Sequence, residues 1–194
     1  MHIKVPNLFI FLDQYIDHIF KNNNTNIGII YRNYTNNKKV NDNELSKIAK
    51  ACKKKRYMLF IANNTKLALK FRADGIYIPA FNKTKSFFNF EKKNFIILGS
   101  AHKQSEIYQK KLQKCKIIFL APTFFVEKSN RFLGIYKFNF LSIRNKIKAL
   151  ALGGINETNI GKLKLLRIKG FGGIGMFKKK TGLLKAGFLK NNFF

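Results

Sequence analysis

Eight short runs of apolar residues recur along the chain, and polar turn residues follow each of them. The runs are apolar almost throughout and do not alternate with polar residues. This pattern is typical of strands buried on both faces, as in parallel sheets covered by helices. The runs occupy residues 7–13, 27–32, 57–62, 75–79, 95–100, 116–122, 148–154 and 170–177.

Segments with helical spacing lie between these runs. The clearest spans residues 42–55, where Asp42 can act as the capping residue. Its apolar positions share one helix face: Leu45, Ile48, Ala49 and Cys52. Three further segments have the same character: residues 65–71, 104–112 and 157–168.

Strands alternating with helices predict an α/β fold. The count of eight strands favours a (β/α)8 TIM barrel, which the 194 residues are just long enough to form. An open, doubly wound sheet with fewer strands is the alternative. No change in composition divides the chain, so we expect residues 1–194 to form a single compact barrel domain.

The net charge of +29 comes from 38 Lys and Arg against 9 Asp and Glu. The basic residues are scattered through every segment, and the chain is also rich in Asn, Ile and Phe, as happens when codon usage is biased. We therefore favour a solvated basic surface over nucleic acid as the partner, and keep a nucleic-acid-binding accessory protein as a remote alternative. Phosphorylated ligands are attracted in either case.

Two cysteines, Cys52 and Cys115, are far apart in the sequence, so neither a disulfide framework nor a clustered zinc site is indicated. The apolar run near the N-terminus is too short to cross a bilayer, and Asp13 follows it directly. We expect a cytoplasmic protein without membrane attachment. A homodimer is left open.

In a barrel of this kind the active site lies at the C-terminal ends of the strands, and the loops after the seventh and eighth strands hold phosphate. In ALGGINETNI, residues 151–160, a strand delivers two glycines to a helix-like segment, which presents bare backbone N–H groups to an anion. The full strand-end set is polar and basic, and consists of Asp13, Arg32, Asn63, Asn82, Ser100, His102, Lys128, Gly153, Gly154 and Gly173.

Several of these residues also have structural explanations. His102 can be a hydrogen-bonded surface histidine, Arg32 can pair with Asp13 or Asp17, and Asn63 can serve a turn. The chain has no Ser-His-Asp order, no Walker-type loop and no His/Cys metal spacing. Of the acidic residues, only Asp13 and Glu127 are expected near the site, because Asp74 precedes its strand and falls at the opposite end of the barrel.

The run LFIANNTKLALKFRADGIYIP, residues 59–79, resembles the thiamine phosphate synthase family, which also contains the thiazole tautomerases. LGSAH at 98–102, APTFF at 121–125, ALGGINETNI at 151–160 and GFGGIGMF at 170–177 follow in the family order. The resemblance covers nearly the whole chain. It implies a (β/α)8 barrel and a transferase of thiamine biosynthesis, which joins hydroxymethylpyrimidine diphosphate to thiazole phosphate and releases pyrophosphate with the help of Mg²⁺.

The resemblance also assigns roles to individual residues. Ser100, beside the leaving group, and Lys128 are the catalytic candidates. The substrate-binding candidates are Arg32 and Lys128, which face the diphosphate, Gly153 and Gly154, which hold the thiazole phosphate, and Gly173 in the second phosphate-binding turn. Asn63 and Ser100 complete this substrate-binding set.

The chain departs from the family pattern where the metal is expected. Asn63 and Asn82 stand where the family has acidic Mg²⁺ ligands, and Tyr77 replaces a histidine. Amide oxygens bind Mg²⁺ less strongly than carboxylates do. Two interpretations remain: a divergent synthase that relies on basic residues, or a catalytically degenerate or tautomerase-like relative that binds thiazole phosphate without coupling it.

Overall fold

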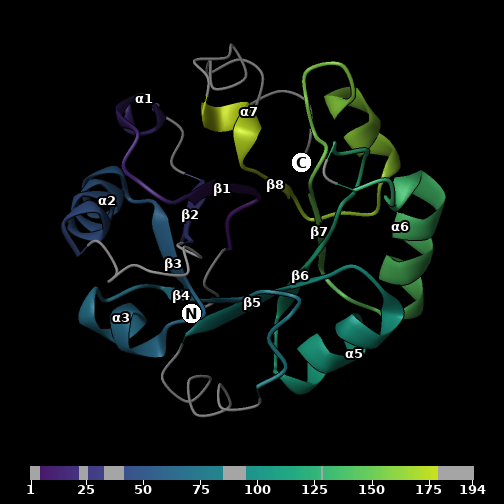
Figure 1. Cartoon of the computed structure of the whole chain (residues 1–194), viewed down its shortest axis with the longest axis horizontal. Coiled ribbons are helices and arrows are strands. Elements are labelled where there is room, and N and C mark those ends of the chain that lie inside the picture. Colours follow the sequence, from purple (N-terminus) through teal and green to yellow (C-terminus); the bar gives the residue numbers. More distant parts are fainter. Residues whose placement is uncertain (1–4, 22–25, 33–41, 85–94, 128, 179–194) are drawn as a thin grey trace.

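The computed structural model describes residues 5–21, 26–32, 42–84, 95–127 and 129–178. Its eight strands are parallel and form a closed barrel in chain order (Figure 1). The strands are β1 (Leu8–Leu12), β2 (Ile27–Tyr31), β3 (Met58–Ala62), β4 (Gly75–Ile78), β5 (Ile96–Ala101), β6 (Ile117–Leu120), β7 (Ala149–Leu152) and β8 (Phe171–Gly173). The predicted barrel is confirmed, and the open sheet is excluded because β1 pairs with β8 in the register Leu8↔Phe171.

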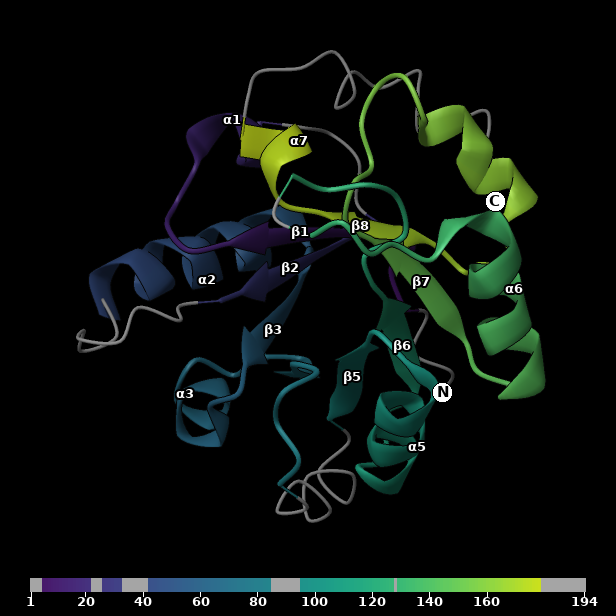
Figure 2. The same ribbon diagram turned by 45° about the vertical axis from the view of Figure 1, so that its right-hand side comes forward.

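Helices surround the barrel, as Figures 1 and 2 show from two directions. They are α1 (Asp17–Phe20), α2 (Asp42–Lys55), α3 (Thr65–Lys70), α5 (Gln104–Leu112), α6 (Gly134–Arg144) and α7 (Gly175–Lys178), with the 3₁₀ helix η1 (Ile160–Leu165) between β7 and β8. None of the helices in the described ranges is both long and apolar enough to cross a bilayer.

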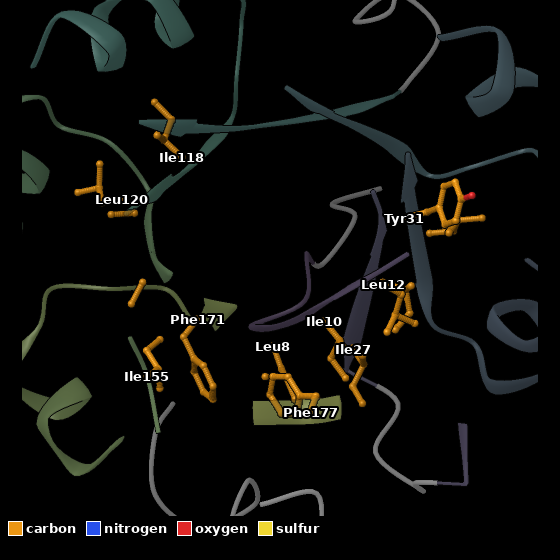
Figure 3. Packing of buried hydrophobic residues seen from close by; sticks show 14 of the residues in the cluster. Leu8, Ile10, Leu12, Ile27, Tyr31, Ile118, Leu120, Ile155, Phe171 and Phe177 are labelled. Carbon is orange, nitrogen blue, oxygen red and sulfur yellow. The ribbon is translucent and has the colours of Figure 1, made fainter. Parts of the chain in front are cut away.

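Side chains alternate between the inside and the outside of the barrel. Leu8, Ile10 and Leu12 of β1 belong to the outer layer that the helices cover, and Figure 3 shows part of this layer with Phe177 of α7 in it. Because both faces of each strand are covered, the sequence pattern is apolar and does not alternate.

The barrel interior is filled by aromatic rings. The ring of Phe119 lies 5.3 Å from that of Phe9 at 87°, and 5.5 Å from that of Phe11, measured between centroids. A Cβ on Gly28 would lie 2.5 Å from the Phe9 ring, so glycine is needed there to admit the ring. The interior is therefore a packed core, and ligands must bind at its mouth.

Two element predictions were wrong. Residues 157–168 do not form an α-helix: a turn is followed by η1, because the Asn156 carboxamide oxygen accepts hydrogen bonds from the backbone N–H groups of Thr158 and Asn159. The run 170–177 is a strand only as far as Gly173, and α7 begins at Gly175. Helices α1 and α6 were not predicted.

Candidate functional site

A cavity of about 290 Å³ opens at the C-terminal ends of β7 and β8. Glycines dominate its lining: Gly153 and Gly154 after β7, Gly172 and Gly173 of β8, and Gly175 at the start of α7. The volume is at the lower end of the range for small-molecule sites, about 300 Å³. Predicted site residues Gly153, Gly154 and Gly173 therefore line one cavity.

The turn after β7 has a conformation that favours glycine. Gly153 and Gly154 have φ angles of +87° and +72°. A Cβ on Gly154 would lie 2.4 Å from the carbonyl oxygen of Phe124, so the backbone after β6 packs directly on this glycine. Asn159 donates from Nδ2 to the carbonyl oxygen of Gly154 at 2.7 Å, which fixes the turn from the other side.

Thr123 holds the loop after β6 against β7, and the sequence reasoning missed it. Its buried hydroxyl accepts a hydrogen bond from the N–H of Leu152 at 2.9 Å and donates to the carbonyl oxygen of Leu120 at 3.0 Å. Its own backbone N–H donates to the carbonyl oxygen of Leu152 at 2.8 Å. APTFF carries part of the family resemblance, but nothing in it separates this hydroxyl from an ordinary loop threonine.

Four residues that line the cavity have backbone N–H groups outside the hydrogen-bond network of the described residues. Within the described part of the chain, the N–H groups of Gly153, Gly154, Ile155 and Ile174 donate to no carbonyl oxygen. Since a backbone N–H away from water needs an acceptor, these four groups suit an anion such as a phosphate.

A second cluster lies at the ends of β2, β4 and β5. The Arg32 guanidinium lies 5.7 Å from the centroid of the Phe11 ring, and the Tyr77 hydroxyl is hydrogen-bonded to Ser100. Burial raises the pKa of Tyr77 to about 12, although the Ser100 hydrogen bond and the Arg32 charge oppose this shift. Tyr77 is thus a neutral hydrogen-bond donor, and Arg32 brings positive charge to the same place.

The other strand-end residues differ in their surroundings. His102 is exposed, with Nδ1 2.7 Å from the carbonyl oxygen of Ala121, and its backbone N–H donates to Glu106 at 2.7 Å. Asp17 forms an ion pair with Lys21 at 2.6 Å. Asp13 and Glu127 are exposed. Lys128 lies outside the described residues, so its predicted role stays a prediction.

Asp74 lies at the opposite end of the barrel, as predicted. Its carboxylate accepts a hydrogen bond from the N–H of Leu59 at 2.7 Å, and its own N–H donates to the carbonyl oxygen of Leu59 at 2.8 Å. Burial raises the pKa of Asp74. The residue joins the starts of β3 and β4 and takes no part in the mouth.

Asn63 and Asn82 are brought together at the mouth. Asn63 has a φ of +58°, and its side-chain oxygen accepts a hydrogen bond from the side-chain amide of Asn82. The side-chain oxygen of Asn82 accepts from the N–H of Thr84 at 2.7 Å. The predicted pair of positions therefore meets in space.

These residues do not fit a Mg²⁺ site. Mg²⁺ is usually held by one or two carboxylates together with substrate phosphates, but both positions offer neutral amides whose oxygens already accept N–H groups. The described ranges hold no group of three or more His, Cys, Asp or Glu residues that could bind a metal.

Known proteins are similar to this chain in sequence. Two thiamine-phosphate synthases from strains of Prochlorococcus marinus are 28% and 30% identical over 132 and 124 residues, or 65% and 62% of this chain. The matched residues span only 37% and 35% of those longer relatives.

Solved structures share the fold. A thiamine phosphate pyrophosphorylase from Pyrococcus furiosus superposes with a TM-score of 0.70 at 17% identity, covering 87% of this chain and 85% of its own. A 2-keto-3-deoxy-6-phosphogluconate aldolase from Zymomonas mobilis reaches 0.63 at 11% identity, covering 87% and 82%. The barrel alone thus does not separate these activities. Because the sequence profile of thiamine monophosphate synthase matches residues 18–176, this chain belongs to the thiamine monophosphate synthase family.

Proposed function

We propose that this protein is a cytoplasmic thiamine phosphate synthase-like transferase that binds thiazole phosphate in the glycine-lined cavity and a pyrimidine diphosphate beside it. The proposal rests mainly on the cavity at the ends of β7 and β8. The residues Gly153, Gly154, Ile155 and Ile174 line it, and their backbone N–H groups can donate to an anion. Membership of the family supports thiazole phosphate as that anion.

In the proposed reaction, the bond between the pyrimidine methylene carbon and the diphosphate oxygen breaks, and the electron pair leaves with pyrophosphate. The ring nitrogen of the thiazole then donates its lone pair to that carbon and forms the new C–N bond. No proton needs to be removed before the bond breaks, so the protein mainly positions the two substrates and stabilises the departing charge.

Arg32, Ser100 and Tyr77 are suited to that charge. The guanidinium can bind two phosphate oxygens at once, and the hydrogen-bonded pair of hydroxyl groups keeps one O–H that can donate to a third. Lys128 is proposed to join them from the loop after β6. The site we propose therefore has two ends. At one end, neutral backbone N–H groups bind the thiazole phosphate, and at the other, cationic side chains bind the diphosphate.

The test is to incubate the purified protein with both substrates, with and without Mg²⁺, and to measure thiamine phosphate. Product formation supports the synthase. If no product forms while thiazole phosphate still binds, the chain is a degenerate or tautomerase-like relative, an alternative favoured by the loss of carboxylates at Asn63 and Asn82. If neither compound binds, the proposed function is wrong.

A further inference from the structure

A lysine is buried beneath the loop after β4. Lys110 of α5 is 0% exposed, and its Nζ donates to the carbonyl oxygens of Pro79 and Asn82 and to Oε1 of Gln113, each at 2.8 Å. The ammonium group has three protons, and these three acceptors use all of them. None of the three is a carboxylate, so neutral oxygens accept all three hydrogen bonds, while the Glu106 carboxylate acts on the charge only from a distance.

Gln109 of the same helix and Gln113, the residue that caps its C-terminus, bind the same loop. Gln113, also 0% exposed, donates from Nε2 to the carbonyl oxygens of Asn82 at 3.0 Å and Thr84 at 2.8 Å. Gln109 donates to the carbonyl oxygen of Lys83 at 3.0 Å. We call Lys110, Gln113 and Gln109 the α5 latch, because together they fix four carbonyl groups of residues 79–84.

The α5 latch and its neighbours use the hydrogen-bonding groups of Asn82 at the barrel mouth. Its main-chain oxygen accepts from Lys110 and Gln113, its side-chain oxygen accepts from Thr84, and its side-chain amide reaches Asn63. Every oxygen of Asn82 therefore has a donor, and a positive charge is bonded to the residue from behind. A divalent cation on Asn82 would have to share these oxygens with their donors and approach that charge.

Burial of a lysine costs free energy unless its hydrogen bonds are strong and complete. Here desolvation lowers the pKa of Lys110 to about 8. Charge-assisted hydrogen bonds to the loop carbonyls offset this cost only while the loop keeps its conformation. The loop and the lysine thus stabilise one another.

We infer that Lys110 is a positioning residue that holds Asn63 and Asn82 as a hydrogen-bonding platform at the barrel mouth, so that this edge of the site works without a divalent cation. The inference rests on the proposed function only for the ligand, a diphosphate. The direct test uses Mn²⁺ alone as the probe, by its paramagnetic resonance signal.

We expect the wild-type protein to bind Mn²⁺ at least tenfold more weakly than the variant Asn63→Asp/Asn82→Asp, which restores carboxylates. A wild type that binds Mn²⁺ as tightly as this variant overturns the inference. The outcome does not depend on any substrate, so a failure of the proposed function is distinguishable from a failure here.

The positioning role is tested with Lys110→Met, and Lys111→Met, an exposed neighbour on the same helix, is the matched control. We expect the N–H of Thr84 to exchange with solvent at least tenfold faster in Lys110→Met and unchanged in the control. Pyrophosphate affinity, measured without Mg²⁺, should fall tenfold while thiazole phosphate affinity stays the same. Equal losses of both affinities, or an unchanged exchange rate of the Thr84 N–H, contradict the positioning role of Lys110.

If Lys110→Met does not fold, the same measurements are made on Gln113→Met.

Discussion

The hydroxyl of Tyr77 on β4 is hydrogen-bonded to Ser100 on the neighbouring strand β5, at the inner edge of the barrel mouth. Both residues are only 4% exposed, and the Arg32 charge acts on the same hydroxyl. A buried tyrosine that stays protonated beside a guanidinium is a donor for anions. We therefore propose the diphosphate end of the site at the ends of β2, β4 and β5, apart from the glycine-lined cavity at the ends of β7 and β8.

Arg32→Met should weaken pyrophosphate binding at least tenfold, because the variant keeps an apolar stem over Phe11 but loses the charge. The control is Arg144→Met, whose guanidinium lies 5.5 Å from the Phe140 ring on α6 in a similar arrangement. Calorimetric titration with pyrophosphate measures both. An equal effect of the two substitutions would show that general surface charge, and not this position, attracts the ligand.

Phe119→Ala should lower the free energy of unfolding by about 3–5 kcal/mol, since it removes the ring that contacts Phe9, Phe11 and Tyr77 and leaves a cavity in the barrel. Tyr136→Ala is the control, because Tyr136 is 93% exposed and should change stability by less than about 0.5 kcal/mol. Urea unfolding gives both values. A small effect at Phe119 would contradict the packed interior.

Both thiols should react slowly with Ellman's reagent in the folded protein at pH 8. Burial raises the pKa of Cys52 and of Cys115 to about 12, so the thiolate fraction is on the order of 10⁻⁴, far below that of an unfolded cysteine. In urea, two thiols per chain should react at once. Rapid labelling of the folded protein would show that one thiol is accessible.

The same shifts predict a pH dependence of stability. Between the ordinary thiol pKa of about 9 and the folded value of about 12, the folded protein keeps protons that the unfolded chain loses. The two thiols therefore contribute their full stability below about pH 9 and lose it as the pH rises toward 12. The Cys52→Ala/Cys115→Ala variant should show a shallower fall of the unfolding midpoint above pH 9, and an identical slope would contradict this assignment.

The strands were predictable because each is apolar on both faces, a pattern that depends on the sequence alone. Helix α5 was predicted with its observed bounds, but its most informative residue was not. Lys110 lies in the sequence QKKLQK, which has the composition of a solvated helix face, and only the packing against residues 79–84 distinguishes it from Lys111.

Other differences have similar causes. The segment after Asn156 failed as an α-helix because its side chains satisfy the local backbone first. The glycine cavity could be expected from GGINETN, but the role of Thr123 depends on the meeting of the loop after β6 with β7. Contacts between segments far apart in the sequence therefore cannot be predicted from the local sequence pattern.

The proposed phosphate site is tested by the affinity of the Gly175→Asp variant for thiazole phosphate, measured by calorimetry. Gly175 lines the cavity, and a Cβ there would meet no atom within 4 Å, so the new carboxylate should repel the phosphate without disturbing the fold. Gly161→Asp is the matched control, because Gly161 also has open space but lies outside the cavity, in η1. We expect that binding falls at least tenfold in Gly175→Asp and is unchanged in Gly161→Asp. Equal affinities in the two variants would contradict the proposed site.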